Sequence, residues 1–312
     1  MAVAVAVAAL AIGNTCFQHI GKAGGGSVKE SIRASPFYTI LKTNPCAQTT
    51  DPTAVSVCHA KSNICTGILN VTNVLVNVRE PVDRFVSAFD WRMSILCQPG
   101  DVRKPGLRTS YESIQKHPCQ GRGDTMLYCK KGIEHEESIL LKYGKDANEL
   151  AESLCARGIK KAGEARSDLA QIGHAKYSLT EKLGGRKILW AKLGSRSSIQ
   201  LTAIPLEPGF NFTEAIADAM RMVLTPPVPH KTRKSADGME LYKHSSVALK
   251  AALGLRKSKL SKTGADCVAQ HYAADYETIG RLADIGCRGP RAANCKAALH
   301  SMIARRNIKI PK

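Results

Sequence analysis

Two short segments carry residue types that bind anions, and each follows an apolar run typical of a buried strand. In the first, segment 16–27, Lys22 comes just before the glycines Gly24, Gly25 and Gly26. A lysine and glycines between a strand and a helix bring outward-facing N–H groups, the positive end of the helix dipole and one full charge together. The first segment therefore predicts a phosphate site.

The second segment, 74–89, is a valine-rich run that ends at Arg79 and continues into a helical pattern with Ser87. A helix starting there would bring Arg79 and Ser87 to one phosphate. Two anion sites on one sheet predict a ligand with two separated phosphates. A kinase-type phosphate loop is disfavoured, because such loops place lysine directly before Ser or Thr, whereas Lys22 precedes the glycines.

Together the segments resemble the cofactor motifs of sulfotransferases that use 3′-phosphoadenosine 5′-phosphosulfate (PAPS). The first family motif, Pro-Lys-Thr-Gly-Gly-Thr-Ser, is matched at Lys22, Gly24, Gly25 and Ser27. The second, Arg-Asp-Pro-x-x-Arg-x-x-Ser-x-Tyr, is matched at Arg79, Pro81, Arg84 and Ser87. The chain departs from these motifs at Gly21, Ala23, Gly26, Glu80 and Phe89. At Gly26 a hydroxyl that faces the phosphate is lost, and Ser27 is its expected replacement.

The resemblance implies an α/β fold, a three-layer sandwich with a central parallel sheet, of the P-loop-like sulfotransferase type. It implies in-line transfer of a sulfuryl group from PAPS to an acceptor hydroxyl, with no metal. Lys22 would assist catalysis at the leaving phosphate. The 5′-phosphosulfate would be bound by Lys22, Ala23, Gly24, Gly25, Gly26 and Ser27. The 3′-phosphate would be bound by Arg79 and Ser87, with Arg84 as a support.

Such a transfer needs a base close to the acceptor oxygen. His59 lies between the two motifs, where glycan sulfotransferases of the heparan type carry a His or Glu. The stretch Cys58-His59-Ala60 resembles the Leu-His-Ala of heparan 6-O-sulfotransferases. A neutral imidazole suits this role; the alternative is a loop histidine flanked by disulfides. Glu30 is the second candidate for the base, whereas His19 is expected to pack against the loop or orient it.

The net charge of +19 favours an anionic partner. Basic residues cluster at 157–161, 230–234, 256–262 and 305–312. These clusters lack interleaved aromatics, and no nucleic-acid-binding signature is present, so a specific nucleic acid is disfavoured. The expected acceptor is therefore an acidic polysaccharide. The alternatives are a small-molecule or protein-tyrosine acceptor, or a catalytically inactive polyanion-binding protein on the same fold.

Eleven cysteines without a Cys-x-x-Cys pair predict disulfides in an oxidising compartment rather than structural zinc. Links are expected among Cys97, Cys119 and Cys129, and among Cys267, Cys287 and Cys295, with the connectivity left open. The apolar run 1–12 resembles a signal peptide core; an edge strand and a membrane-anchor remnant are the alternatives. These features favour the secretory pathway, and the resemblance to Golgi carbohydrate sulfotransferases implies the Golgi lumen. The oligomeric state is left open.

Residues 13–312 are predicted to form one domain with a Cys-rich insertion at 97–129 and a basic helical C-terminal extension. Apolar runs predict strands at 15–20, 72–78, 187–193 and 199–204. Helical spacing predicts helices at 27–34, 82–95, 134–157, 174–183, 212–224, 265–285 and 294–306. In helix 265–285, Tyr272 and Tyr276 share the apolar face. This pair resembles the terminal helix of Golgi sulfotransferases, with plain core packing as the alternative.

Overall fold

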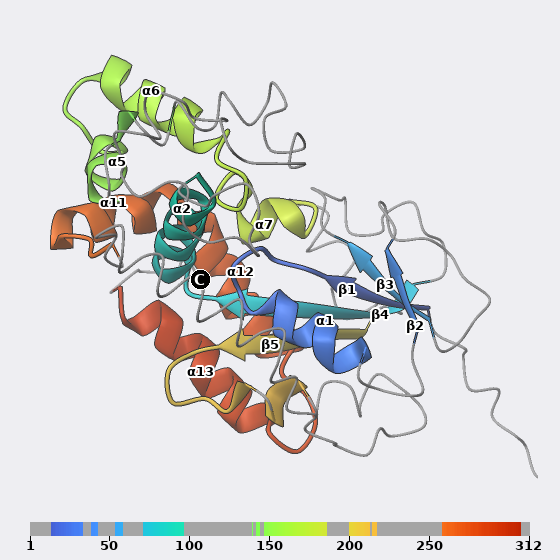
Figure 1. The fold of residues 1–312 in the computed structure, drawn as a ribbon. Coiled ribbons are helices and arrows are strands. Elements are labelled where there is room, and N and C mark those ends of the chain that lie inside the picture. Colours follow the sequence, from blue (N-terminus) through green and yellow to red (C-terminus); the bar gives the residue numbers. More distant parts are fainter. Residues whose placement is uncertain are drawn as a thin grey trace, which may run out of the picture.

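The computed structural model describes residues 14–33, 39–42, 54–58, 71–96, 139, 142–143, 147–185, 200–212, 214–216 and 258–306. These residues form an α/β fold in which helices flank a parallel sheet (Figure 1). The run 1–12, the Cys-rich segment 97–129 and the strand expected at 187–193 lie outside the described residues. Among the helices that the structure does describe, none is long and apolar enough to cross a membrane.

The sheet has five parallel strands in the order β2-β3-β1-β4-β5. Its strands are β1 (Asn14–Gln18), β2 (Thr39–Lys42), β3 (Ala54–Cys58), β4 (Val71–Arg79) and β5 (Gln200–Leu206). The central strands are buried on both faces, as the unbroken apolar run of β4 predicts for a parallel sheet. Because all strands run in one direction, the residues that follow β1 and the end of β4, including Lys22 and Arg79, lie at the same edge of the sheet.

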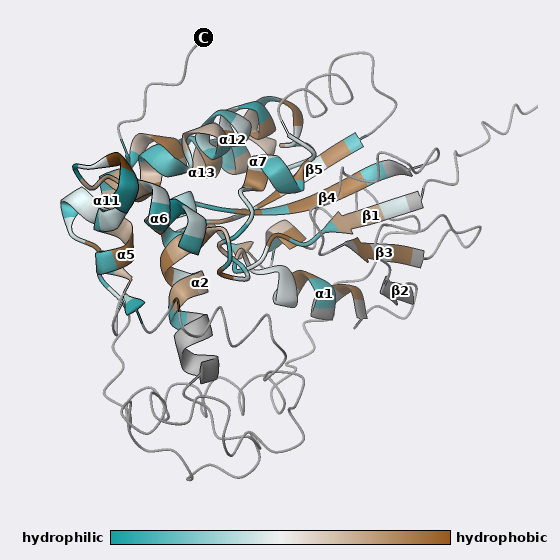
Figure 2. Ribbon diagram, turned by 90° about the horizontal axis from the view of Figure 1, so that it is seen from above, coloured by the Kyte–Doolittle hydropathy of each residue, from teal (hydrophilic) through white to brown (hydrophobic). Residues whose placement is uncertain are grey.

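Helices cover both faces of this sheet. Helix α1 (Gly25–Arg33) packs Val28 and Ile32 into the same core cluster as Phe17 of β1. On the opposite face, α12 (Ala273–Ile285) and α13 (Ala292–Ala304) share a core cluster with Cys16. Successive residues of β1 thus face different layers. This arrangement is compatible with a three-layer sandwich, and the apolar stretches along the strands are visible in Figure 2.

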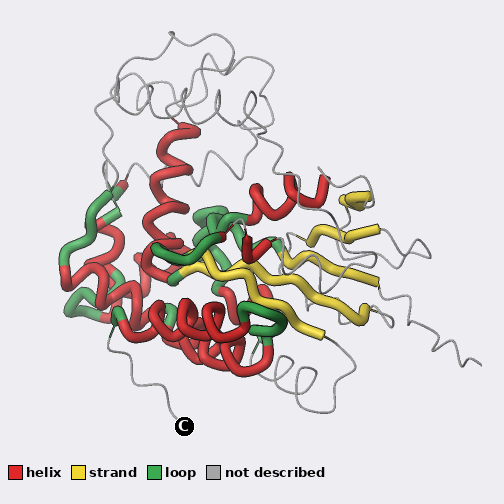
Figure 3. The backbone as a smooth tube through the Cα atoms, turned by 90° about the horizontal axis from the view of Figure 1, so that it is seen from below, coloured by secondary structure: helices red, strands yellow, loops and turns green. Residues whose placement is uncertain are grey.

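A third core lies among the helices at one end of the sheet (Figure 3). It joins α2 (Pro81–Leu96), α5 (Asn148–Ser153), α6 (Ile159–Leu169) and α11 (Lys262–His271). The short helix α7 (Leu179–Lys182) packs instead against the face that α12 covers. This helical core therefore lies at the end of the sheet where β4 continues into α2.

Two predicted helices need correction. Helix 265–285 is wrong as a single helix, because Tyr272, with φ −98° and ψ 24°, separates α11 from α12. The apolar spacing identified the buried face but not this break. Helix 174–183 is wrong over its first half, where residues 174–177 form turns. Ser178 then starts α7 through a capping box with Glu181, which explains the late start.

The other predicted elements agree in part with the structure. The helices at 27–34, 82–95 and 294–306 and the strands at 15–20, 72–78 and 199–204 are confirmed with shifted ends. Of the helix predicted at 134–157, the described residues form the helix α5, and the chain turns after it. The helix predicted at 212–224 lies mostly outside the described residues.

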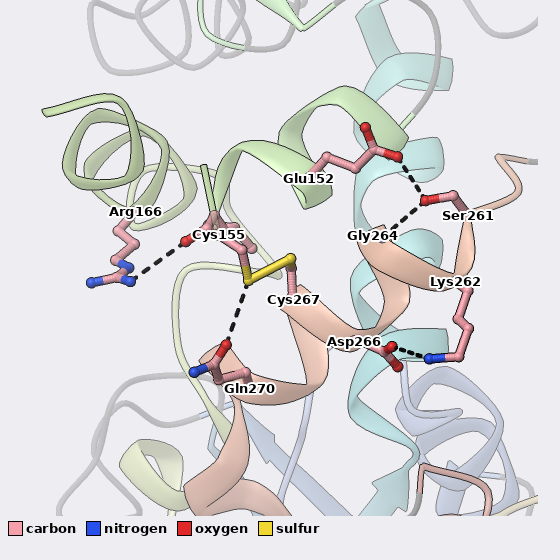
Figure 4. Close-up of a disulfide and its surroundings, with 10 residues drawn as sticks. Glu152, Cys155, Arg166, Ser261, Lys262, Gly264, Asp266, Cys267 and Gln270 are labelled. Atoms are coloured by element: carbon pink, nitrogen blue, oxygen red, sulfur yellow. Dashed lines mark hydrogen bonds and ion pairs between the residues drawn. A yellow bond between two sulfur atoms is a disulfide. The ribbon is translucent and has the colours of Figure 1, made fainter. Parts of the chain in front are cut away.

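The disulfide prediction is half right. Cys287 and Cys295 are bonded, and they join the turn after α12 to α13. Cys267, expected in the same group, instead pairs with Cys155, and this bond ties the end of α5 to α11 (Figure 4). The error arose because the two cysteines are 112 residues apart in sequence and only the tertiary fold brings them together. Cys97, Cys119 and Cys129 lie outside the described residues.

Candidate anion-binding site

The glycine-rich loop (residues 19–26) connects β1 to the first turn of α1. Within it Lys22 adopts a left-handed backbone conformation with φ 63°, and Gly24 follows with φ 81°. A residue with a side chain pays roughly 1–2 kcal/mol for this conformation. Such strain persists only where the surroundings fix the backbone, and it gathers at functional sites. The backbone at Lys22 must therefore be held by other groups.

Asn77 of β4 provides most of that support. Its side-chain amide donates to Ile20 O at 2.9 Å and to Ala23 O at 2.7 Å, and its Oδ1 accepts from Ile20 N at 2.9 Å. Asn77 is fully buried, so each of these bonds forms away from water. No motif in the sequence pointed to this residue. The available signal was an amide within the apolar run 74–78 of β4, since a buried polar group needs partners.

Arg79, at the end of β4, reaches the same loop. Its Nη1 donates to Lys22 O at 3.0 Å, so a residue of each motif is in direct contact. Burial lowers the pKa of Arg79, and the nearby carboxylates Asp83 and Glu80 oppose that shift. The sequence analysis predicted two separated phosphate sites. The structure brings the lysine of one motif and the arginine of the other to one edge of the sheet.

The backbone donors of the loop divide into two groups. Ala23 N donates to Ile20 O at 3.3 Å, and Ser27 N donates to Gly24 O at 3.0 Å, so both are used inside the loop. The N–H groups of Gly24, Gly25 and Gly26 lie just before and within the first turn of α1, where a helix leaves donors unsatisfied. These three N–H groups are therefore the candidates for backbone contacts with a phosphate.

Three aromatic or imidazole rings pack directly on loop glycines. An added Cβ would lie 2.3 Å from His174 Nδ1 at Gly21, and 2.5 Å from Phe212 Cζ at Gly24. At Gly25 it would lie 1.8 Å from His19 Cδ2, which confirms the expectation that His19 packs against the loop. By contrast, a Cβ on Gly26 would meet nothing within 4 Å. Ring packing therefore explains why glycine occupies positions 21, 24 and 25 but not why it occupies position 26.

Arg84 lies behind the loop rather than on its surface. Its guanidinium is 2% exposed and pairs with the fully buried Asp275 of α12 at 3.4 Å. It also donates to Tyr177 O at 2.9 Å and to His174 O at 3.5 Å. Asp275 in turn accepts from the N–H groups at the start of α7, Leu179 N at 2.8 Å and Thr180 N at 2.9 Å. This pair therefore supports the segment 174–180 next to the loop.

The tyrosines of α12 also make specific polar contacts. Tyr276 donates a short hydrogen bond to Glu80, the residue that precedes α2 and accepts from Asp83 N in its first turn. Burial and the charge of Glu80 raise the pKa of the Tyr276 hydroxyl. Tyr272 donates to Ala175 O at 2.8 Å. Both hydroxyl groups thus connect α12 to segments that flank the site, in addition to the core packing of their rings.

The remaining predicted site residues lie as follows. Ser27 lies in the first turn of α1 and is half-buried. Glu30 lies in the second turn of the same helix. Ser87 is half-buried on α2, two turns beyond Arg79. His59 lies outside the described residues. No cluster of metal-ligating side chains occurs in the part of the chain that the structure describes.

Lys182 is a buried cation that the sequence analysis did not identify. Its Nζ lies 5.8 Å from the centre of the Tyr177 ring, and Lys176 lies 5.2 Å from the same ring. Burial, and then the charge of Arg84, lower the pKa of Lys182 to about 8. A buried lysine with a lowered pKa beside an arginine is the environment expected where an anion binds.

This shift predicts a pH-dependent stability difference between wild type and Lys182→Met. The pKa of Lys182 is the ordinary 10.5 in the unfolded chain and about 8 in the folded one. While the lysine is protonated in both states, its buried charge therefore lowers the free energy of unfolding. The variant should therefore be the more stable protein at pH 7. The difference should shrink between pH 8 and 10.5, measured as urea midpoints. Lys176→Met, at an exposed lysine, is the control; a difference that does not change with pH would contradict the prediction.

Searches of protein-family models, curated proteins and solved structures find no match to the chain. Function is therefore inferred from the geometry of this site.

Proposed function

We propose that the protein is a PAPS-dependent sulfotransferase of the Golgi carbohydrate type, built on the P-loop-like sulfotransferase variant of the α/β fold. The observation that supports it most is the hydrogen bond from Arg79 to the backbone of Lys22. Ligands of open parallel sheets bind beyond the carboxyl ends of strands where the strand order reverses. The chain runs from β1 out to β2 and returns to place β4 on the other side of β1, so this bond spans that position.

In the proposed reaction an acceptor hydroxyl attacks sulfur in line, and negative charge develops on the leaving phosphate oxygen. Preorganised donors stabilise such charge. Lys22 and the N–H groups of Gly24, Gly25 and Gly26 would bind the phosphosulfate. The 3′-phosphate is proposed to contact Arg79 and Ser87. Two described disulfides agree with an oxidising compartment such as the Golgi lumen.

The proposed acceptor is a hydroxyl of an acidic polysaccharide, because the chain carries a net charge of +19. The basic clusters differ in whether acidic residues of the fold pair with their charges. Arg305 pairs with Glu207 at 2.6 Å, and Arg306 pairs with Glu80 at 3.2 Å, so both charges are matched within the fold. The exposed residues Arg157, Lys160 and Lys161 lie at the start of α6. These three residues are the better candidates for contact with an anionic chain.

A second candidate is a catalytically inactive polyanion-binding protein with the same fold. It is favoured by two observations: Asp275 neutralises the motif residue Arg84, and ring packing accounts for three loop glycines. The two functions differ in what they require of Lys22. An enzyme needs its ammonium group, whereas polyanion binding through α6 does not.

The test compares wild type with Lys22→Gly in sulfate transfer from PAPS to a panel of glycans and small alcohols. We expect transfer to fall by roughly 100-fold or more, the loss typical when one charge-stabilising donor is removed. Because glycine favours a positive φ, the variant should be at least as stable as wild type, which separates lost activity from lost folding. Lys296→Ala, at an exposed lysine on α13, is the control.

Binding of the desulfated nucleotide, 3′,5′-ADP, is measured on the same samples by calorimetry. Binding by wild type that weakens in Lys22→Gly supports the proposed cofactor site. If wild type neither binds 3′,5′-ADP nor transfers sulfate, the sulfotransferase proposal is wrong. Heparin binding that is insensitive to Lys22→Gly would then favour the inactive polyanion-binding protein.

A further inference from the structure

His174 lies against the glycine-rich loop, although it comes from a distant part of the sequence. A Cβ on Gly21 would be 2.3 Å from His174 Nδ1 and 2.9 Å from Cγ, so the imidazole packs on the backbone just before Lys22. His174 is only half-buried. No sequence motif pointed to this residue.

Buried side chains form hydrogen bonds with the backbone around His174. Arg84 donates to the carbonyl oxygens of His174 and Tyr177, and Tyr272 donates to that of Ala175. Asp275 holds Arg84 and accepts from the first N–H groups of α7. A segment without regular structure thus receives support from a fully desolvated ion pair, an expensive arrangement for a surface turn. Such support is what a site residue needs to keep one geometry.

We infer that His174 is the base of the proposed reaction. As the acceptor oxygen bonds to sulfur, its proton passes to the imidazole; the bond from sulfur to the bridging oxygen breaks, and its electron pair leaves with the nucleotide phosphate. The inference rests on the proposed function, and it gives His174 the role that the sequence analysis assigned to His59. The contact with Gly21 supports it, because it places an imidazole against the loop that would bind the phosphosulfate, whose sulfur the acceptor hydroxyl attacks.

Charged groups from every neighbouring element face this region. They are Lys22 on the loop, Arg84 on α2, Asp275 on α12, and Lys176 and Lys182 around Tyr177. His19 packs on the opposite part of the loop, at Gly25. Because several of these groups are ionisable, a pH profile alone would not assign the base. The test therefore compares matched substitutions at single positions.

The experiment uses the full-length chain with His174→Gln, His59→Gln and, as the control, the exposed His300→Gln of α13. Turnover is followed as sulfate transfer, or as slow sulfate release from PAPS to water, which requires no known acceptor. Removing a general base lowers turnover by about 10²–10⁴-fold. We expect that loss in His174→Gln, with 3′,5′-ADP affinity within about threefold of wild type, and with the fall of kcat/KM at low pH abolished.

Each other outcome has a distinct meaning. If His174→Gln keeps wild-type turnover while His59→Gln loses it, the base is His59 and the inference is overturned while the proposed function stands. If nucleotide binding and turnover fall together in His174→Gln, the residue only shapes the loop, which also overturns it. If wild type binds 3′,5′-ADP but turns over no PAPS, His174 is not a catalytic base. If wild type does not bind 3′,5′-ADP at all, the proposed function itself fails.

Discussion

Replacing Asp275 with alanine is expected to lower the free energy of unfolding by about 3–5 kcal/mol, the usual effect of breaking a buried ion pair. The carboxylate is fully buried, pairs with Arg84, and accepts the N–H groups of Leu179 and Thr180. Its removal leaves the Arg84 charge and two backbone donors without these acceptors, away from water. Urea denaturation followed by circular dichroism measures the effect.

The matched control is Asp266→Ala. Asp266 is half exposed and pairs with Lys262 one turn earlier on α11 (Figure 4). An exposed pair of this kind contributes about 0.3–0.5 kcal/mol, so the control should change stability little. Similar losses in both variants would show that the Arg84–Asp275 pair is not a principal support of the fold. Asp275→Asn keeps an acceptor without the charge, and it should fall between wild type and alanine.

Removing the disulfide between Cys155 and Cys267 is expected to destabilise the fold more than removing the bond between Cys287 and Cys295. In the chain-entropy account, a bond that closes a loop of this length stabilises the fold by about 5 kcal/mol. The cysteines are separated by 112 residues, and they join the exposed end of α5 to the buried face of α11. The double variant Cys155→Ser with Cys267→Ser, unfolded in urea without reductant, measures this contribution.

The second disulfide provides an internal comparison. Cys287 and Cys295 are separated by only 8 residues, so the same account gives about 2.5 kcal/mol for the double serine variant. The first double variant should therefore unfold at the lower urea concentration. Equal midpoints would show that loop closure does not govern the stability contributed by these bonds.

The sequence by itself determined the elements that carry the candidate site. The apolar run before Arg79 predicted β4, and helical spacing predicted α2 and α13, because such patterns reflect burial that each segment needs wherever it packs. The positions of Lys22 and Arg79 at strand ends also followed from local order along the chain. The functional roles of these two residues stay predictions.

Only the tertiary structure decided which residues support that site. Asn77 of β4 donates a hydrogen bond to the loop that follows β1. Asp275 forms an ion pair with Arg84, although the two residues are far apart in the sequence. The contact of His174 with Gly21 and the partner of Cys267 are of the same kind. Residue spacing reports which face of an element is buried but not what lies opposite that face. These partners are determined by the packing of distant segments, so no local pattern could have revealed them.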